Sequence, residues 1–504
     1  MLEFIQELNF IISLETILSE IYIFFVASTL LLLGIGYRNS EHLGYPFIVS
    51  PVLFLGVMGL IGSGLVLINL EVSYGEILFN GLICHDLFSY IVRGVALVVG
   101  GLILLASKHY LRSEHINIYE FTILVLLSIL GIIFLGEAHD LIILYLGLEL
   151  ISLSFYVLAG SQRLSPFSVE SAIKYYILGA FASCILLLGI AIIYIETGTT
   201  NFEELRLQEF LNLNDPDYRS GSLLGVVCIG TAFLFKLSAA PFHGWAPDVY
   251  EGAPTPVSIL FSILPKLGII VAFIRFFLGT YGTYTDVWLP ILFVSAFASL
   301  IIGSILALIQ KGFKRFLVYS SIGHIGFILL GLSTTYIGGI GSSLFYLFVY
   351  ISMGILGWTL LLSLNFVNKN GRVKYLTDIG SLGKSNPVMA ISFVLLLFSI
   401  AGVPPLGGFF GKFFVIFAAL KGGAFFIGQI ALLISVVSAY YYLRIIKILL
   451  FEKSYKGIPF FLDVGREKSL IIGSSLFFLM FFYFVCEDLQ NISFMVSDSF
   501  NLVF

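Results

Sequence analysis

Five ionisable residues lie inside stretches of sequence that are otherwise apolar: Glu149, Lys236, Lys266, His324 and Lys412. An ionisable side chain in hydrocarbon costs at least a few kcal/mol unless it is paired or hydrated. A lysine buried alone tends to lose its proton and a glutamate buried alone tends to gain one, whereas both stay charged when they are brought together. We therefore predict that these residues hold and release protons, and that the distance between Glu149 and Lys236 decides whether the lysine keeps its proton.

Glu149 lies in the stretch DLIILYLGLELISLSFYVLAG, about nine residues from its start and hence roughly 14 Å deep in a helix. Tyr145, Ser152 and Tyr156 recur around it at helical spacing and predict one polar stripe on that helix. Lys236 lies in the middle of its own apolar stretch by the same count. Both residues have structural alternatives: a protonated Glu149 bonded to a neighbouring hydroxyl, and a Lys236 bonded to the carbonyls of a loosened helix.

The other three residues also have alternatives. Lys266, in SILPKLGII, follows Pro265, and Lys412 follows a Gly- and Pro-rich break, so a long side chain that snorkels to the membrane surface is the competing interpretation for both. His324, in YSSIGHIGF, lies ten residues beyond Lys314 and hence about 15 Å deep. Its neutral imidazole can pass a proton between two waters, although a lone histidine is also a common packing residue. We expect the five residues at similar depth, away from lipid, along an axis in the membrane plane.

The composition excludes a soluble globular protein. Of the 504 residues, 59% are hydrophobic and 11% are charged, and the mean hydropathy is +1.04. The net charge of −4, without a basic cluster, excludes nucleic-acid binding. No CxxC pair and no GxGxxG stretch occur, so neither a metal nor a cofactor is expected on this chain. The beginning, MLEFIQELNF, resembles neither a transit peptide nor a secretory signal.

Apolar runs long enough to cross about 30 Å of hydrocarbon predict roughly fourteen membrane spans. They begin near Ile21, Phe47, Leu87, Ile118, Asp140, Tyr175, Leu223, Val257, Val287, Phe313, Gly338, Val388, Gly422 and Ile471. Their Leu, Ile and Phe content is typical of helices, because barrel strands would be about ten residues of alternating polarity. The predicted fold is an all-α membrane protein.

The distribution of Lys and Arg supports an even number of spans. Eighteen of the 26 basic residues fall in the loops after spans one, three, five, nine, eleven and thirteen. Four fall on the opposite side: Arg206, Arg219, Arg275 and Lys421. Short loops on the side of synthesis collect basic residues, so both termini are predicted on the basic-poor side. The remaining four lie inside spans, and they include Arg93, for which we expect a structural ion pair with a carboxylate such as Asp86.

Two predicted spans are interrupted, the seventh at LFKLSAAPFHGWAPDVYEGAPTP and the twelfth at AGVPPLGGFFGKFF. Pro241 removes an amide donor and frees the carbonyl of Leu237, which hydrocarbon cannot satisfy. We expect water to reach Lys236 and Lys412 at these breaks, with capping by Ser or Thr side chains as the alternative. Paired broken helices are typical of transporters built from inverted repeats. We therefore predict a three-helix segment at 1–112, inverted repeats of five helices at 113–280 and 281–451, and a loop with the last helix at 452–504.

Several of these stretches resemble one family. LYLGLELISLSFYVLAG, FLFKLSAAPFHGWAPDVYEGAPTPV, KRFLVYSSIGHIGF and AGVPPLGGFFGKF are similar to subunit 2, called subunit N in bacteria, of proton-pumping respiratory complex I, an NADH:quinone oxidoreductase. The resemblance implies an antiporter-like fold of fourteen helices with a broken seventh and twelfth helix. The family's glutamate of helix five falls on Glu149, and its lysines of helices seven, eight and twelve fall on Lys236, Lys266 and Lys412. His324 enters the expected proton-translocating set from the residue analysis alone.

The resemblance also implies partners and a location. The partners are other membrane-arm subunits, lipid and protons, and NADH, FMN, iron–sulfur clusters and quinone are expected on other subunits. Animal mitochondrial versions lack the first three helices, which this chain keeps. The similarity therefore favours a multi-pass protein of the mitochondrial inner membrane of plant, algal or protist type, with both termini on the intermembrane-space side. A bacterial plasma membrane is the alternative.

Three other functions stay open. A subunit of a multisubunit cation/proton antiporter would share the fold and the charged residues, although HGWAPDVYEGAPTPV favours the respiratory subunit. A structural membrane-arm component would need no ion path, and the complete set of one glutamate and three lysines argues against it. A plastid homologue that takes electrons from ferredoxin is the third.

Overall fold

The computed structural model describes residues 15–36, 49–69, 75–114, 116, 118–211, 216–334, 337–364, 372–380, 382–452 and 464–503. Part of the span and loop predictions falls outside these residues, at Arg38, Phe47, Lys369, Lys453 and Lys456. The chain divides into two compact units. The first contains residues 1–236, 264–285 and 498–504, and the second contains residues 237–263 and 286–497.

The first unit is built from helices and one short hairpin. Its elements are α2 (Leu18–Gly36), α3 (Val49–Asn69), β1 (Glu76–Leu78), β2 (Ile83–His85), α4 (Leu87–Ser113), α5 (Ile118–Glu137), α6 (Leu141–Ala159), α7 (Pro166–Thr197), α8 (Phe202–Leu211) and α9 (Pro216–Leu237). The second half of α11 (Thr255–Phe273) and the π-helix η1 (Ile274–Thr280) also belong to it. The strands pair antiparallel, with Glu76 opposite His85.

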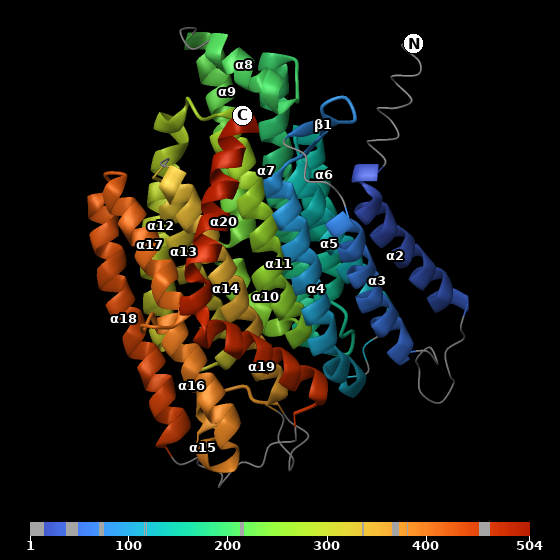
Figure 1. Ribbon diagram of the computed structural model, residues 1–504, viewed down its shortest axis with the longest axis vertical. Helices are drawn as coiled ribbons and strands as arrows, with labels where there is room; N and C mark the ends of the chain where they lie inside the picture. Colours follow the sequence, from blue (N-terminus) through green and yellow to red (C-terminus); the bar gives the residue numbers. More distant parts are fainter. Residues whose placement is uncertain are drawn as a thin grey trace. The chain divides into compact units, whose positions relative to one another are not determined.

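Helix α5 is the centre of the first unit. It packs against α2, α3, α4 and α6, and Figure 1 shows these helices side by side in blue to teal. Helices α5 and α6 approach each other closely, since a Cβ added at Gly131 would lie 2.9 Å from the carbonyl oxygen of Gly147. Small residues let two helix backbones approach in this way. This contact sets the position of α6, which carries Glu149.

Side-chain caps begin α4 and α6, two of the helices that carry ionisable residues in this unit. Asp86 precedes α4; its carboxylate accepts from the amide of Ser89 and its own amide donates to the Ser89 hydroxyl, which is a capping box. Asp140 precedes α6 and accepts from the amide of Ile142. Such caps satisfy amide groups that have no partner within the helix. Helix boundaries are thus encoded locally, even at the ends of apolar spans.

The second unit is also helical. Its elements are α10 (Trp245–Gly252), α12 (Thr285–Ile309), α13 (Phe313–Leu332), α14 (Ile337–Ser363), the 3₁₀-helix η2 (Leu376–Ile379), α15 (Leu382–Ser385), α16 (Pro387–Ala401), α17 (Gly407–Lys421), α18 (Phe425–Leu450), α19 (Arg466–Met480) and most of α20 (Phe482–Val503). Helix α14 packs against α13, α16, α17 and α19, and α13 also packs against α17. The core of this unit therefore lies around α14.

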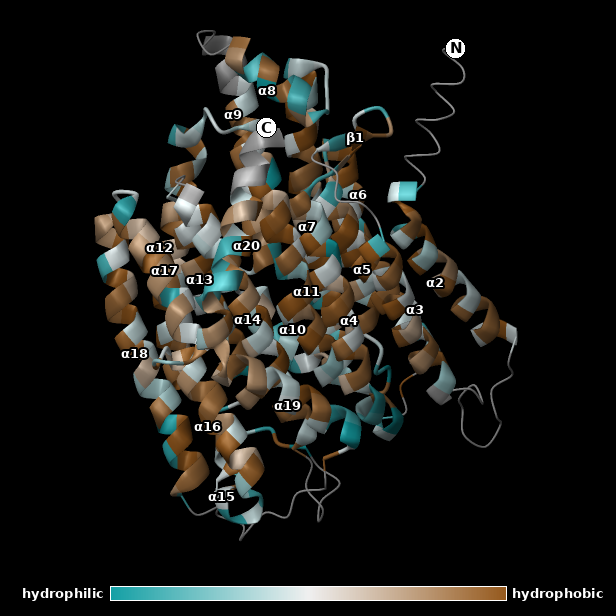
Figure 2. Cartoon of the chain, in the orientation of Figure 1, coloured by the Kyte–Doolittle hydropathy of each residue, from teal (hydrophilic) through white to brown (hydrophobic). Residues whose placement is uncertain are grey.

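The predicted all-helical membrane architecture is confirmed. Within the described residues, eleven helices are long and apolar enough to cross a membrane, or twelve if Arg466–Met480 and Phe482–Ser497, bent by 81°, form one span. Figure 2 shows the hydrophobic colour along most of α2 and α3, and hydrophilic patches on α8. Two shorter apolar helices, Gly221–Leu237 and Pro387–Ala401, lie where the interrupted seventh and twelfth spans were predicted.

Two basic residues that were assigned to loops are buried instead. Arg275 lies in η1, within the apolar segment Thr255–Thr280, and its side chain is fully buried. Lys468 lies in the first turn of α19, where its amine donates to the carbonyl of Leu362 at 2.9 Å. The loop assignment was wrong for both because each has a buried acceptor from a distant part of the chain.

Candidate functional site

Glu149 lies in the middle of α6 and is half-buried. Its Oε2 accepts a hydrogen bond from the Ser152 hydroxyl at 3.2 Å, and the same hydroxyl donates to the Glu149 carbonyl at 3.1 Å. Its Oε1 is buried and has no hydrogen-bond partner among the described residues. Two turns beyond Glu149, the Tyr156 ring meets Tyr175 edge-on, with 4.9 Å between centroids. The polar stripe predicted on α6 therefore faces aromatic side chains of α7.

Lys236 lies in the last turn of α9, and its Nζ is buried without a hydrogen-bond partner in the described part of the chain. The charge of Glu149 acts on Lys236, but the two side chains form no ion pair within 4 Å. A buried carboxylate oxygen and a buried amine thus lie in the same unit without direct contact.

Helix α9 ends at Leu237, one residue after Lys236. Ser238 has a positive φ of 59°, and its hydroxyl donates to the Leu237 carbonyl at 2.5 Å. Pro241 was predicted to free this carbonyl. A serine side chain caps it, which agrees with the alternative that Ser or Thr side chains, and not water, satisfy the freed carbonyls.

Lys266 lies in α11 and is 1% exposed. Pro265, inside the same helix, displaces the carbonyls of the preceding turn. The Tyr250 hydroxyl donates to the carbonyl of Phe261 at 2.9 Å, and the Tyr350 hydroxyl donates to that of Ser262 at 3.0 Å. Two tyrosines therefore compensate the proline in the turn before Lys266.

His324 and Tyr346 form the centre of the candidate site in the second unit. His324, on α13, is 6% exposed, and its Nδ1 lies 2.6 Å from the Tyr346 hydroxyl on α14. The ring of Tyr350 lies 5.6 Å from the imidazole. On α17, a Cβ at Gly411 would come within 2.3 Å of the Tyr346 ring. Gly411 is required here because Tyr346 packs directly against the backbone next to Lys412.

Lys412 bridges the two halves of the second break. It is 6% exposed, and its Nζ donates to the carbonyls of Ile400 at 2.8 Å and Ala401 at 3.1 Å. The amine also lies 5.5 Å above the ring of Phe327, one turn from His324 on α13. The lysine itself thus satisfies carbonyls at the end of α16, and it does not snorkel. A protein donor occupies the freed carbonyls at this break, where water was expected.

The segment between the two halves of this break is tightly packed. Gly402, with φ 92°, ends α16, and a Cβ at Gly408 would meet the Ser399 carbonyl oxygen at 1.8 Å. Only glycine allows the start of α17 to cross the end of α16 at this distance. The crossing brings Lys412 back to the last turn of α16.

Residues 138–438 match the family described as NADH:quinone oxidoreductase/Mrp antiporter, TM. NADH-ubiquinone oxidoreductase chain 2 of Marchantia polymorpha is 40% identical, over 92% of this chain and 94% of the relative. NADH-quinone oxidoreductase subunit N of Rhodospirillum rubrum is 36% identical, over 92% and 93%. The chain belongs to the chain 2/subunit N family of NADH:quinone oxidoreductases.

Solved structures agree with this membership. A chain of respiratory complex I from Thermus thermophilus with bound aureothin superposes with a TM-score of 0.76 at 26% identity, covering 94% of this chain and 98% of that one. A chain of the Mrp complex from Dietzia reaches 0.77 at 20% identity, covering 96% and 97%, which shows a shared fold alone. The resemblance inferred from the sequence is therefore confirmed.

The structure of this family member brings the predicted residues into two groups. Glu149, Lys236 and Lys266 belong to the first unit, and His324 and Lys412 belong to the second. The sequence analysis did not predict Tyr346 and Tyr350 as site residues. Their spacing of four residues places both hydroxyls on one face of α14, and the same helical spacing of polar residues predicted the polar stripe on α6.

The expected structural ion pair of Arg93 with a carboxylate is present, but Asp86, the example named for its partner, does not form it. Arg93 pairs with Glu20 and Glu137, while Asp86 pairs with Arg275 at 2.7 Å. Arg275 also donates to the Gly136 carbonyl at 2.7 Å. Asp86 caps α4, the helix that carries Arg93, but its carboxylate pairs with Arg275 of η1 and not with Arg93.

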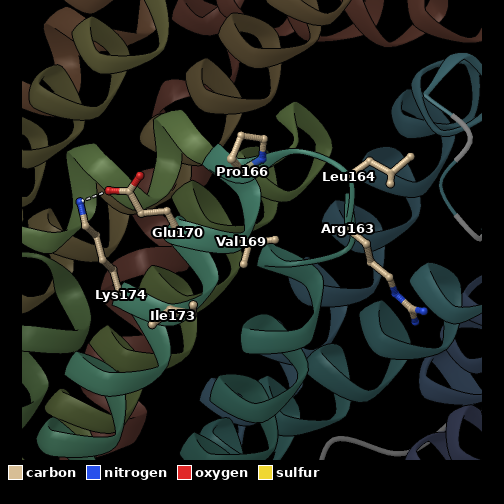
Figure 3. Close-up of a pocket in the computed structure, with 7 residues that line it drawn as sticks. All are labelled: Arg163, Leu164, Pro166, Val169, Glu170, Ile173 and Lys174. Atoms are coloured by element: carbon tan, nitrogen blue, oxygen red, sulfur yellow. Dashed lines mark ion pairs between the residues drawn. The ribbon is translucent and has the colours of Figure 1, made fainter.

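A surface pocket of about 700 Å³ lies at the start of α7, apart from the charged residues of the candidate site. Figure 3 shows Lys174 directed to Glu170, with 2.7 Å between their charged atoms, and Arg163 directed away from both. Leu164 is fully exposed at its edge. This open pocket has none of the buried ionisable groups that proton transfer requires.

Proposed function

We propose that the chain is a proton-translocating membrane-arm subunit of NADH:ubiquinone oxidoreductase. The observation that carries the proposal is the buried amine of Lys236, which has no hydrogen-bond partner in the described part of the chain and lies under the influence of the Glu149 charge. A buried ammonium without a partner is unfavourable, so a small change in its distance to Glu149 changes proton occupancy. The proposed proton carriers are Glu149, Lys236, Lys266, His324 and Lys412.

In the first unit, proton transfer is governed by the distance between Glu149 and Lys236. When Glu149 approaches, both groups are charged and Lys236 holds its proton; when it withdraws, Lys236 releases the proton. The Ser152 hydroxyl, which already bonds Glu149 Oε2, holds the carboxylate in the withdrawn position. Lys266, nearly inaccessible to solvent, is the next proton acceptor in this proposal.

In the second unit, the imidazole of His324 and the hydroxyl of Tyr346 transfer the proton. Their contact of 2.6 Å is short enough for a proton to move along the hydrogen bond, with the direction set by the imidazole tautomer. Lys412 is held by α16 carbonyls, so release of its proton leaves a neutral amine that can still donate to them.

The finer architecture belongs to the same proposal. We propose fourteen membrane helices, with inverted repeats at 113–280 and 281–451, in which the short helices Gly221–Leu237 and Pro387–Ala401 are halves of broken spans. The chain would lie among other membrane-arm subunits and lipid in the mitochondrial inner membrane, with both termini on the intermembrane-space side. NADH oxidation and quinone reduction would take place on other subunits, without a cofactor on this chain.

The proposal is tested with the assembled complex reconstituted in liposomes. We expect Lys236→Gln and Glu149→Gln to leave assembly intact and to lower the number of protons moved per NADH oxidised, because each variant removes one charge of the pair. Lys174→Gln is the matched control, since this partly exposed lysine of α7 pairs with Glu170 at the surface. An unchanged proton-to-electron ratio in both variants would leave a structural role as the better explanation.

The antiporter alternative has its own readout. A cation/proton antiporter exchanges protons against an imposed sodium or potassium gradient without NADH. We expect no proton movement in that condition. Movement that depends on Lys236 would assign the chain to antiport instead.

A further inference from the structure

A second group of buried charges lies in the first unit, where α2 and α4 begin and α5 ends. It contains Glu20 on α2, His85 on β2, Arg93 on α4 and Glu137 on α5. Their exposed fractions are 2%, 7%, 2% and 0%. None of them belongs to the proton path proposed above.

The guanidinium of Arg93 is the centre of this group. Its Nε contacts Oε1 of Glu137 and lies 3.2 Å from Oε1 of Glu20. Nη1 donates to the Thr16 carbonyl at 3.2 Å, and Nη2 faces the imidazole of His85. Two carboxylates from different helices therefore meet at one guanidinium.

His85 contributes no positive charge to the group. A guanidinium can only donate, so the imidazole nitrogen that faces Arg93 must accept and the ring is neutral. Burial, together with the charges of Arg93 and Arg275, lowers the pKa of His85 to about 2.

The neighbouring charges are already balanced. Arg275 pairs with Asp86, and Ser19, which donates to Glu20 Oε1 at 2.9 Å, is uncharged. Residues 1–14 and 70–74, which the structure does not describe, contain no Lys or Arg. The group thus has two carboxylates for one cation.

The negative charge that Arg93 does not balance lies at the second oxygen atoms of the two carboxylates. Oε2 of Glu20 and Oε2 of Glu137 are buried and have no hydrogen-bond partner among the described residues. An unpaired negative charge in such surroundings is costly, and two carboxylates that share a site resolve it by keeping one proton. Because Oε1 of Glu20 and Oε1 of Glu137 meet the same Nε of Arg93, the two carboxyl groups lie close together and one proton can serve both.

We propose that Glu20 and Glu137 share one proton beside Arg93 and form a buried proton-binding site in the first unit. The site is independent of the proton path through Glu149 and Lys236, and it can be present even if that path is wrong. Its ligand is a single proton, held at the end of the helix bundle formed by α2, α4 and α5.

Infrared spectroscopy of the assembled complex in liposomes tests the proposal, because a protonated carboxyl absorbs apart from carboxylates and amides and shifts in D₂O. At pH 7 we expect such a band, and we expect Glu137→Gln to remove it, since the remaining Glu20 carboxylate then balances Arg93. Glu20→Gln should remove the same band. Glu120→Gln is the control on α5, where this carboxyl lies at the opposite end of the helix and accepts from Tyr119.

The two variants lie on different helices, so either one that assembles is sufficient. A band that disappears in Glu137→Gln or Glu20→Gln and persists in Glu120→Gln supports the shared proton. A band that persists in the Glu20 and Glu137 variants overturns the proposal. The absence of any exchangeable acid band in the unmodified complex overturns it as well, without a variant.

Discussion

The side-chain amine of Lys412 lies 2.8 Å from the carbonyl oxygen of Ile400, at the last turn of the preceding helix. Carbonyls at a helix end have no partner within the helix and carry the negative end of its dipole. An ammonium at this position is stabilised by both effects. Lys412 therefore fastens α17 to α16, and this structural role exists beside the proposed proton transfer.

We expect Lys412→Met to loosen the end of α16 by about 1–3 kcal/mol, because two buried carbonyls lose their donor. Hydrogen exchange of the amides at residues 397–401 measures this effect in the assembled complex. Lys421→Met is the matched control, since this lysine lies exposed at the end of α17, the helix that also carries Lys412. Equal exchange in the two variants would contradict the capping role.

Tyr346→Phe removes the hydroxyl that contacts His324 and retains the ring that packs against Gly411. We expect normal assembly and a slower proton-pumping rate, by up to about a hundredfold, as when a positioned proton donor is lost. The control is Tyr350→Phe, because that hydroxyl donates to the Ser262 carbonyl on α11. A similar decrease in both variants would show that α14 packing, and not the His324 contact, controls the rate.

We expect the docking of α8, which lies outside the membrane spans, to depend on pH through Glu209. It is 1% exposed on α8 and accepts from the Thr283 hydroxyl, and burial raises its pKa from the ordinary value of 4.5 to about 7. Because the folded state binds the proton more tightly, this carboxyl favours docking of α8 most below pH 4.5. The contribution, on the order of 3 kcal/mol, is lost as the pH rises to 7.

We expect Glu209→Gln to remove this pH dependence and to protect α8 above pH 7. Limited proteolysis of α8 at several pH values, compared with the unmodified protein at each value, measures the difference. Glu204→Gln changes an exposed carboxylate on the same helix and should leave the dependence intact. An unchanged pH profile in Glu209→Gln would be inconsistent with a carboxyl that titrates at this contact.

Gly131→Ala should destabilise the first unit by about 1–3 kcal/mol, because the new methyl would lie 2.9 Å from the Gly147 carbonyl and push α5 from α6. Thermal unfolding of the assembled complex and its yield measure the change. Gly101→Ala on α4 has open space and should be neutral or stabilising. Equal stability of the two variants would show that α6 can shift without cost.

Much of the candidate site could be predicted from the sequence because its signals are local. Apolar runs of spanning length, isolated charges within them and prolines at the breaks at Pro241 and Pro404 each depend on a few neighbouring residues. The membrane strengthens these signals, since it requires every backbone group to be satisfied and penalises every stray charge. The helical class and the membership of the family follow from such local patterns.

The partners of the buried charges were decided only by tertiary structure. Arg93 is seven residues from Asp86, yet it pairs with Glu20 and Glu137, because α5 packs against both α2 and α4 and so brings those carboxylates to it. Lys412 likewise bonds carbonyls eleven and twelve residues away, because Gly408 lets two helices cross. Sequence spacing specifies the face of one helix, whereas the choice of partner depends on how several helices pack, and no local pattern contains that information.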